Sequence, residues 1–185
     1  MVMEERAIKI VEACLKETSK NPIEIFRKIS QMDFIRMHGP EHHILDGGAL
    51  LTAFYNAGGN IDLEKSLEEL TNRGMKMPIG ICGMWGVCGA VTSIGAALSI
   101  IAKANPDKIA DPWGTNMECT SKAVASLGEV GGPRCCKRNG YLAFKEAIKF
   151  VNKYYDVELE DQDIKCIHSH INMQCIKERC PFYNG

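Results

Sequence analysis

The feature that most constrains this chain is an uncharged stretch of 26 residues, Met77–Ala102, with a lysine on either side. A stretch of that length is long enough to cross a lipid bilayer as a helix. Its first half contains Pro78 and has a glycine at every third position from Gly80 to Gly89, which disfavours a regular helix there. We therefore expect a glycine-rich loop that leads into a buried central helix at 90–104, with a membrane span as the alternative.

The composition is that of an ordinary globular protein, because 45% of the 185 residues are hydrophobic and 24% are charged. This balance excludes disorder for most of the chain, and the length suits a single domain. The 22 basic and 23 acidic side chains give a net charge of −1. That charge argues against nucleic acid as a partner, because a nucleic-acid-binding surface needs many positive charges. We divide the single domain, 1–185, into N-terminal helices (1–75), a Gly/Cys-rich core (76–155) and a cysteine-rich tail (156–185).

Apolar residues recur at helical spacing along most of the chain, and no long β-type alternation appears before residue 164. Asn21 followed by Pro22 is typical of a helix start. The predicted fold is mainly α: a single helical domain around a buried central helix, with a cysteine-rich C-terminal metal-binding tail. The expected helices cover 4–18, 22–31, 46–56, 63–72, 90–104, 116–128 and 141–154.

Nine cysteines are too few, and odd in number, for a disulfide scaffold in a chain of this length. The first residues, Met1–Glu5, lack the basic and apolar regions of a signal peptide. We therefore expect a cytoplasmic protein in a reducing compartment, where clustered cysteines usually bind metal or carry out redox chemistry. Cys14, near the apolar stripe of the first helix, is expected to be a small core residue.

Three cysteines of the tail, Cys166, Cys175 and Cys180, lie within fifteen positions and can converge on one metal centre. Iron–sulfur clusters are held by cysteine thiolates, and a final ligand followed by proline is familiar in that chemistry. A fourth ligand has to come from elsewhere in the chain or from a substrate. Zinc is the alternative, in a Cys₃His site completed by His168 or His170.

Cys82 and Cys88 lie six residues apart in the glycine-rich loop. On one straight helix their side chains would point about 240° apart. In a glycine-rich loop, however, the backbone can turn tightly and approach a cluster or a substrate closely. We expect both to be catalytic thiols; the alternative is two small residues packed in a tight core.

Cys135 and Cys136 are adjacent, and the side chains of adjacent residues diverge. We expect Cys135 to bind metal with the tail cysteines and Cys136 to remain a free nucleophile. Three cationic neighbours, Arg134, Lys137 and Arg138, and the start of a helix are expected to lower the pKa of a thiol here. The alternative is a solvated basic turn with two incidental thiols.

One further segment, 38–46, completes the candidate chemistry. His38, Glu41, His42 and His43 lie close together, and Asp46 follows three residues later. Imidazole and carboxylate groups at this density can relay protons or bind a metal. The proline within this segment excludes a regular helix through the whole motif. The alternative is a histidine-rich entry into a helix, with His43 the residue most easily explained by packing.

Together these motifs resemble an uncharacterised family of cysteine-rich domains from anaerobic bacteria and methanogenic archaea. The matching segments are 38–43, 82–89, 131–138 and 179–182, and Cys119 lies outside them. Some members of that family stand alone, and others are fused to methyltransferase-like or radical-SAM-type domains. The resemblance implies the cytoplasm of an anaerobe, where exposed iron–sulfur centres survive, and it implies no particular reaction.

The function expected from these observations is redox or sulfur-transfer catalysis by cysteine thiolates beside a 4Fe–4S cluster. The expected partners are a small-molecule or sulfur-containing substrate and an electron donor such as a ferredoxin, with neither nucleic acid nor a membrane. The alternative is a zinc- or cluster-stabilised accessory module without catalytic activity. The residues expected to be catalytic are His38, Glu41, His42, Cys82, Cys88 and Cys136; those expected to bind substrate are His43, Arg134, Lys137 and Arg138; and those expected to bind metal are Cys135, Cys166, Cys175 and Cys180. Cys136, Cys82, Cys88 and an open iron remain alternatives for the fourth ligand position.

Overall fold

Helices form nearly all of the regular structure in the computed structural model, which describes residues 1–104, 106–107 and 112–185. This described part contains eight α-helices, two short 3-10 helices and no β-strand, which confirms the predicted mainly-α fold. The α-helices are α1 (Met3–Lys16), α2 (Pro22–Ile29), α3 (His42–Asn56), α4 (Leu63–Met75), α5 (Ile81–Met84), α6 (Gly89–Ile101), α7 (Pro112–Val130) and α8 (Cys136–Tyr154); the 3-10 helices are η1 (Ser169–Ile171) and η2 (Lys177–Arg179).

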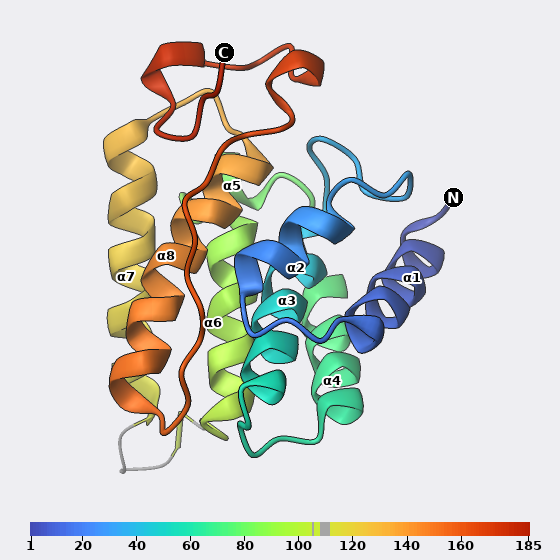
Figure 1. The fold of residues 1–185 in the computed structure, drawn as a ribbon, viewed down its shortest axis with the longest axis vertical. Coiled ribbons are helices and arrows are strands. Elements are labelled where there is room, and N and C mark those ends of the chain that lie inside the picture. Colours follow the sequence, from blue (N-terminus) through green and yellow to red (C-terminus); the bar gives the residue numbers. More distant parts are fainter. Residues whose placement is uncertain (105, 108–111) are drawn as a thin grey trace.

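Helix α6 lies at the centre of the molecule, as the uncharged stretch predicted (Figure 1). It packs against α3, α4, α7 and α8, and its residues Ile94, Ala97 and Leu98 are fully buried. The glycine-rich segment before it forms a loop that contains the one-turn helix α5. Among the helices that the structure describes, none has the length and apolar character needed to cross a membrane.

Helix α3 is buried along most of its length and begins four residues earlier than the expected start at Asp46. The backbone N–H of Leu45 donates to the carbonyl oxygen of Glu41 (2.8 Å), so the first turn is already closed there. Pro40 directly precedes this turn, a place where proline is tolerated because the first helical N–H groups have no partner within the helix. The earlier start places His42 and Asp46 one turn apart on the same face of α3.

Gly47 allows α3 and α6 to approach each other closely. Its backbone N–H donates to Ser93 Oγ (2.9 Å), and a Cβ atom at this position would lie 2.5 Å from the carbonyl oxygen of Ser93. Real Cβ atoms do not approach backbone oxygen so closely, so any side chain here would push the two central helices apart. The glycine therefore sets the spacing between the helix that carries the histidines and the central helix.

We predict that Gly47→Ala destabilises the protein by about 1–3 kcal/mol, the usual cost of overpacking a core. Gly128→Ala in α7 is the matched control, because a Cβ there would meet no atom within 4 Å. Alanine also favours a helix over glycine by about 1 kcal/mol, so the control should be as stable as the wild type or more stable. Urea unfolding followed by circular dichroism measures both, and equal stability of the two variants would contradict the close contact.

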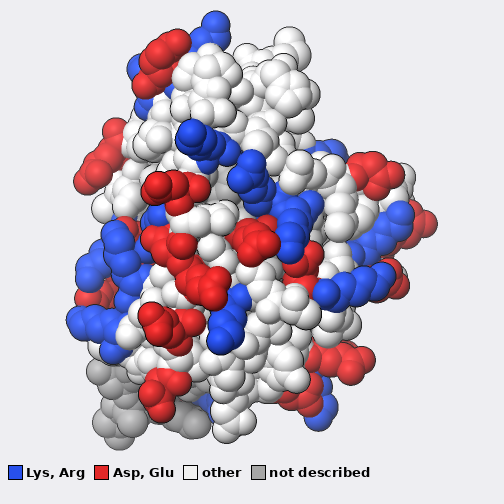
Figure 2. Space-filling view, viewed as in Figure 1, with Lys and Arg blue, Asp and Glu red and all other residues white. Residues whose placement is uncertain are grey.

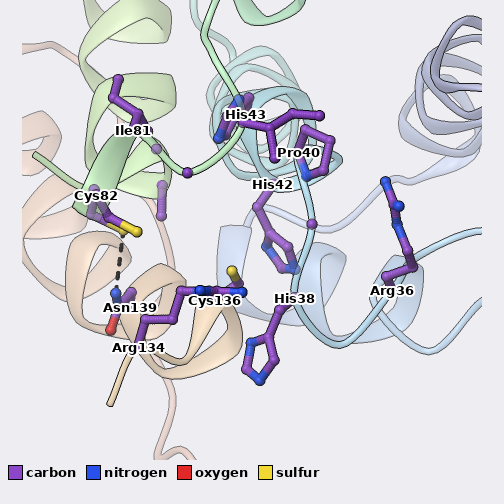
Figure 3. Close-up of a pocket in the computed structure, with 16 residues that line it drawn as sticks. Arg36, His38, Pro40, His42, His43, Ile81, Cys82, Arg134, Cys136 and Asn139 are labelled. Atoms are coloured by element: carbon purple, nitrogen blue, oxygen red, sulfur yellow. Dashed lines mark hydrogen bonds between the residues drawn. The ribbon is translucent and has the colours of Figure 1, made fainter. Parts of the chain in front are cut away.

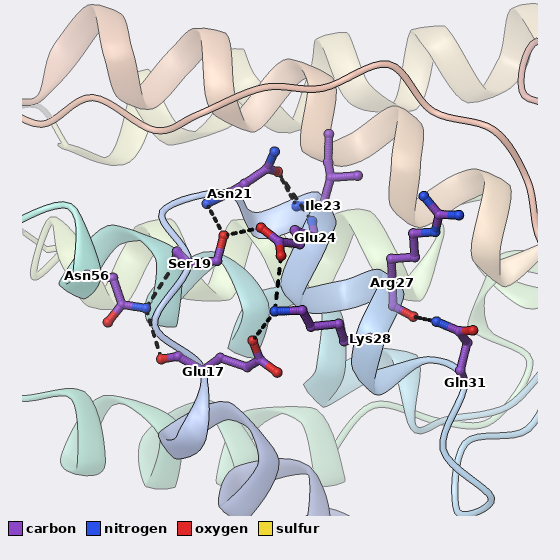
Figure 4. Close-up of polar contacts among 9 residues, drawn as sticks. All are labelled: Glu17, Ser19, Asn21, Ile23, Glu24, Arg27, Lys28, Gln31 and Asn56. Carbon is purple, nitrogen blue, oxygen red and sulfur yellow. Dashed lines mark hydrogen bonds and ion pairs between the residues drawn. The ribbon is translucent and has the colours of Figure 1, made fainter.

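The start of α2 is held by Asn21, as predicted (Figure 4). Its Oδ1 accepts the backbone N–H groups of Ile23 (3.0 Å) and Glu24 (3.3 Å), which would otherwise lack a partner at the helix start. Asn56, at the end of α3, donates from Nδ2 to the carbonyl oxygen of Glu17 (3.0 Å) in the same connection. These bonds fix α2 against α3 and so position the loop after α2, which carries the histidine motif.

The C-terminal tail, 156–185, runs back along α8 and then folds over the N-terminal end of that helix (Figure 1). The backbone N–H of Cys166 donates to the carbonyl oxygen of Phe182 (2.7 Å), which closes this part of the tail on itself. The Phe182 ring packs edge-on against Tyr141 of α8, with the ring centroids 5.5 Å apart. The tail cysteines are thereby held at the start of α8.

Charged side chains of both signs are interspersed over the face of the molecule shown in Figure 2. This distribution agrees with a net charge of −1 from 22 basic and 23 acidic residues. No broad single-sign surface is visible on this face. The exclusion of nucleic acid as a partner stays a prediction.

Candidate functional site

The first turn of α8 separates the two adjacent cysteines. Cys135 is the N-cap residue of the helix, and its Sγ accepts the backbone N–H of Arg138 (3.4 Å). Its side chain lines a small pocket with the three tail cysteines, whereas Cys136 lines a larger cavity among the histidines. The two thiols thus face different sites, as expected for neighbouring side chains that diverge.

The small pocket, which we call the four-cysteine pocket, is lined by Cys135, Cys166, Cys175 and Cys180 and has a volume of about 20 Å³. All four thiols are free. The sulfur of Cys166 accepts the backbone N–H of residue 168, and the sulfur of Cys175 accepts that of residue 177, each at 3.4 Å. Cysteine side chains gathered at one pocket are the ligand set of both iron–sulfur clusters and structural zinc sites. The donor set therefore fits a group that is held by cysteine thiolates.

The described residues that line the four-cysteine pocket include neither a histidine nor a carboxylate. His168, a candidate for the Cys₃His zinc site, is instead buried with its Nε2 3.3 Å from Ser30 Oγ. Over 1–104, 106–107 and 112–185, no three side chains of the Cys, His, Asp or Glu type are close enough to hold a single metal ion.

Burial has a larger effect on the pKa values of the two thiols at the start of α8 than the neighbouring cations have. It raises the pKa of Cys135 and raises the pKa of Cys136 to about 12, because a thiolate loses its hydration when it is removed from water. The nearby Arg138 guanidinium lowers the pKa of Cys135, but by less than burial raises it. The expectation of a net lowered thiol pKa at this turn is therefore wrong, because burial outweighs the effect of the cations. Cys136 needs a base before it can act as a nucleophile.

The larger cavity has a volume of about 320 Å³ and brings together most of the predicted catalytic residues (Figure 3). We call it the histidine cavity. Its walls are the loop before α3, the glycine-rich loop before α6, and the start of α8. Three predicted residues, Glu41, Lys137 and Arg138, do not line it and are buried in the protein. The predicted residues that do line it are His38, His42, His43, Cys82, Cys88, Arg134 and Cys136.

A buried chain of hydrogen bonds runs from Asp46 through His42 to Lys137. His42 Nδ1 lies 3.1 Å from Asp46 Oδ1, and His42 Nε2 lies 3.2 Å from Lys137 Nζ. Lys137 also donates to the carbonyl oxygens of Ser30 and Arg36, each at 3.3 Å. Because an ammonium group has three N–H donors and no acceptor, His42 Nε2 accepts from it and Nδ1–H donates to Asp46. Both ring nitrogens of His42 are therefore occupied.

Burial of this chain disfavours the charged form of each member. It holds the pKa of His42 well below its usual range and that of Asp46 well above, and it lowers the pKa of Lys137 to about 8. The sequence analysis expected Lys137 to contact a substrate, but its side chain is only 1% exposed. Its position suits a different task, which is to orient His42.

Glu41, predicted to be an acid–base residue, is fully buried and serves as an ion-pair partner. Its Oε1 accepts from Arg36 Nε (2.6 Å) and lies 3.1 Å from Arg6 Nη1 of α1. A Cβ atom at Gly39 would collide with the Glu41 carboxylate, so a side chain there would displace this ion pair. Glu41 therefore joins α1 to the loop that carries the histidines.

Asn172 of the tail connects the histidine cavity to the four-cysteine pocket. Its Oδ1 lies 3.1 Å from His38 Nε2, and its Nδ2 donates to Cys135 Sγ at 3.6 Å. An amide oxygen only accepts hydrogen bonds, so His38 carries its proton on Nε2 and leaves Nδ1 with a free lone pair. That Nδ1 is buried and has no hydrogen-bond partner in the part of the chain that the structure describes. Sequence analysis missed Asn172, because nothing in its local sequence distinguishes it from any loop asparagine.

The remaining cysteines fall into two groups. Cys88 is the N-cap residue of α6, and its Sγ accepts a hydrogen bond from Asn139 Nδ2 (3.3 Å), while Cys82 lies half-buried on α5. Burial raises the pKa of Cys88 above its usual value. Cys14 and Cys119 are 0% and 2% exposed in the hydrophobic core. The prediction that Cys14 is a core residue is confirmed.

Comparison with known proteins places these sites in a family. Residues 10–183 match a family described as a family of unknown function, DUF5714. The chain belongs to the DUF5714 family. This agrees with the resemblance to an uncharacterised domain, and the matched range includes every residue of both sites in this DUF5714 protein. Searches among curated proteins and among solved structures found no match.

We predict that this DUF5714 protein loses stability as the pH falls through about 6.5, in part because of His43. Burial lowers the pKa of His43, so near pH 6.5 the unfolded chain takes up a proton that the folded chain does not. This contribution to stability is full above that pH and decreases on acidification, by up to about 1.4 kcal/mol per pH unit. The urea midpoint of His43→Gln should therefore fall less on acidification than that of the wild type. Parallel pH profiles for the two proteins would contradict the burial of a neutral imidazole.

Proposed function

We propose that this is an iron–sulfur protein in which Cys135, Cys166, Cys175 and Cys180 hold a 4Fe–4S cluster. The observation that carries the proposal is that one pocket is lined by these four thiols, which come from the start of α8 and three points of the tail. A 4Fe–4S cluster is held by four cysteine thiolates. When bound there, such a cluster supplies one electron at a time to the neighbouring site.

We further propose that the histidine cavity is the place of the reaction, a redox or sulfur-transfer step on a small-molecule or sulfur-containing substrate. Two features support this. Cys135 and Cys136 are consecutive residues, so the four-cysteine pocket and the histidine cavity adjoin at the start of α8. Asn172 adds a hydrogen-bonded connection between Cys135 and His38. If the step is a reduction, an electron donor such as a ferredoxin would supply the electrons that the substrate gains.

Cys136 and His38 are the residues best suited to start the chemistry. The buried thiol of Cys136 needs a base, and His38, whose Nδ1 has no hydrogen-bond partner among the described residues, lines the same cavity. Transfer of the S–H proton to Nδ1 leaves a thiolate that can attack sulfur or another electrophile. His42 is less suited to carry this proton, because Asp46 and Lys137 occupy both of its nitrogens. We assign His42 the task of shaping and polarising the cavity wall.

The setting that the resemblance implies suits this chemistry. The cytoplasm of an anaerobe would protect both a cluster near the protein surface and a reactive thiol from oxygen. Fusion of some relatives to methyltransferase-like or radical-SAM-type domains would bring such a site next to other reactive centres.

We predict that Cys135→Ser loses the cluster and that Cys136→Ser keeps it, although the two residues are neighbours. Cys135→Ser removes a proposed ligand and should abolish or bleach the broad visible absorption near 400 nm. Cys136→Ser is the matched control and should keep that absorption but lose activity. Cys166→Ser, Cys175→Ser and Cys180→Ser should behave like Cys135→Ser. A full spectrum in all four of these variants would contradict the assignment of ligands.

The size of the four-cysteine pocket favours a second candidate function. Its volume of about 20 Å³ leaves little room for a cluster, and the four thiols would have to draw closer together to hold one ion, because no three of them are close enough as they lie here. Four cysteines can also hold one zinc ion in a structural site. In that case the protein is a zinc-stabilised accessory module, and none of the Cys→Ser variants has a visible spectrum to lose.

We predict that Asn172→Leu lowers the reduction potential of the cluster. The Asn172 amide donates to Cys135 Sγ, and a donor at the sulfur stabilises the more negative, reduced state. Gln174→Leu in the same loop is the control, because that side chain is exposed. A redox titration followed by electron paramagnetic resonance measures both. An unchanged potential in Asn172→Leu would show that the Asn172 contact has no electrostatic effect on the site.

A further inference from the structure

A second cavity of about 490 Å³ adjoins the histidine cavity, and Cys82, Cys88, Arg134 and Asn139 line both. The second cavity opens between the glycine-rich loop, α7 and the start of α8. Among the described residues that line the two cavities there is no aspartate or glutamate. The charged and titratable side chains in the walls, cysteines aside, are Arg36, Arg134, Arg138, His38, His42 and His43. Arginine guanidinium groups are therefore the permanent charges in the described walls of the joined cavities, and no carboxylate lines these walls.

Arg134 is the cation that the two cavities share. Its side chain is exposed and makes no hydrogen bond or ion pair with another described residue. By contrast, Arg36 pairs with Glu41, and Arg138 donates to two carbonyl oxygens of the turn before it. Figure 3 shows the Arg134 side chain extending from the start of α8 into the site, toward Cys136. Its guanidinium group is therefore available to a ligand.

Arg138 places a second guanidinium group in the wall of the second cavity. It is 4% exposed and lines the second cavity, yet its Nε–H is buried without a hydrogen-bond partner among the described residues. A buried donor of this kind usually has a partner, and leaving it unpaired costs about 1–3 kcal/mol. The Nη2 of Arg138 donates to the turn before α8, so Arg138 contributes positive charge to the wall, and Arg134 remains the group for direct contact with a ligand.

We propose that the joined cavities bind a small molecule that carries an oxyanion group, a carboxylate or a phosphate, held by Arg134. The proposal deepens the proposed function and rests on it, because it names the class of substrate of the same site. A guanidinium group binds either oxyanion through paired N–H donors. The cavity volume of about 320 Å³ is in the range of small-molecule sites. The rest of the substrate would then lie against Cys82 and Cys136.

The test compares two alkylating agents that differ mainly in charge, iodoacetate and iodoacetamide. In each, the cysteine thiolate displaces iodide and forms a C–S bond, so the ratio of the two rates reports the attraction of a carboxylate to the site. Mass spectrometry gives this ratio at Cys82, and the urea-unfolded chain gives the reference ratio. We expect the folded protein to favour iodoacetate by about fivefold over the reference, the effect of one unit charge about 4 Å away in water.

Arg134→Gln should remove that preference, whereas Arg73→Gln, which changes an arginine on the exposed face of α4, should keep it. A folded-state ratio equal to the reference, or a preference that survives in Arg134→Gln, would overturn the proposal. Neither result would alter the visible spectrum or the effect of Cys135→Ser. Failure of the anion site is therefore distinguishable from failure of the cluster.

A second measurement does not depend on thiol reactivity. Succinate or inorganic phosphate should raise the midpoint of thermal unfolding of the wild type, whereas uncharged succinamide should not. The anion that gives the larger rise identifies the oxyanion as carboxylate or phosphate. Arg134→Gln should abolish the rise. No rise with either anion, or an equal rise in Arg134→Gln, would contradict recognition by this guanidinium group.

Discussion

Successive residues of an α-helix point about 100° apart. For this reason consecutive side chains at the start of α8 lie in several different sites. Cys135 joins the four-cysteine pocket, Cys136 lines the histidine cavity, and Lys137 enters the buried hydrogen-bond chain. Arg138 donates a hydrogen bond to a carbonyl oxygen of the preceding turn, and Asn139 donates one to Cys88 at the end of the glycine-rich loop. Five consecutive side chains thus connect the tail, the histidine loop and the start of the central helix. A shift of this turn would disturb every part of the candidate site.

The polar residues behind the histidine cavity are costly to bury, so each needs a hydrogen-bond or charge partner. Asp46, His42 and Lys137 are each at most 1% exposed, and an unpaired charge in such a place destabilises a protein by several kcal/mol. The lysine avoids this by donating to two backbone carbonyl oxygens as well as to His42. The result is a rigid wall in which the protonation of His42 is defined by its neighbours. Such a wall suits a site that must hold a substrate in one orientation.

Much of the fold could be predicted from the sequence, because its strongest patterns are local. The uncharged 77–102 stretch indicated a loop and a buried central helix, and Asn21 indicated the start of α2. The divergence of Cys135 and Cys136 also followed from their adjacency. The thiol pKa values could not be predicted, because they depend on burial by segments that are distant in sequence. For the same reason the roles of Asn172 and Lys137 emerged only when the tail and α3 were seen against α8.

The central claim is that the four-cysteine pocket is a metal centre beside a reaction cavity. Its most direct test is the content of iron, zinc and acid-labile sulfide per chain, measured on protein purified without oxygen. The account predicts about four iron and four sulfide per chain, as a 4Fe–4S cluster requires. About one zinc without sulfide would support the structural module in place of the catalytic cluster. Absence of both metals in freshly isolated protein would contradict a metal centre altogether.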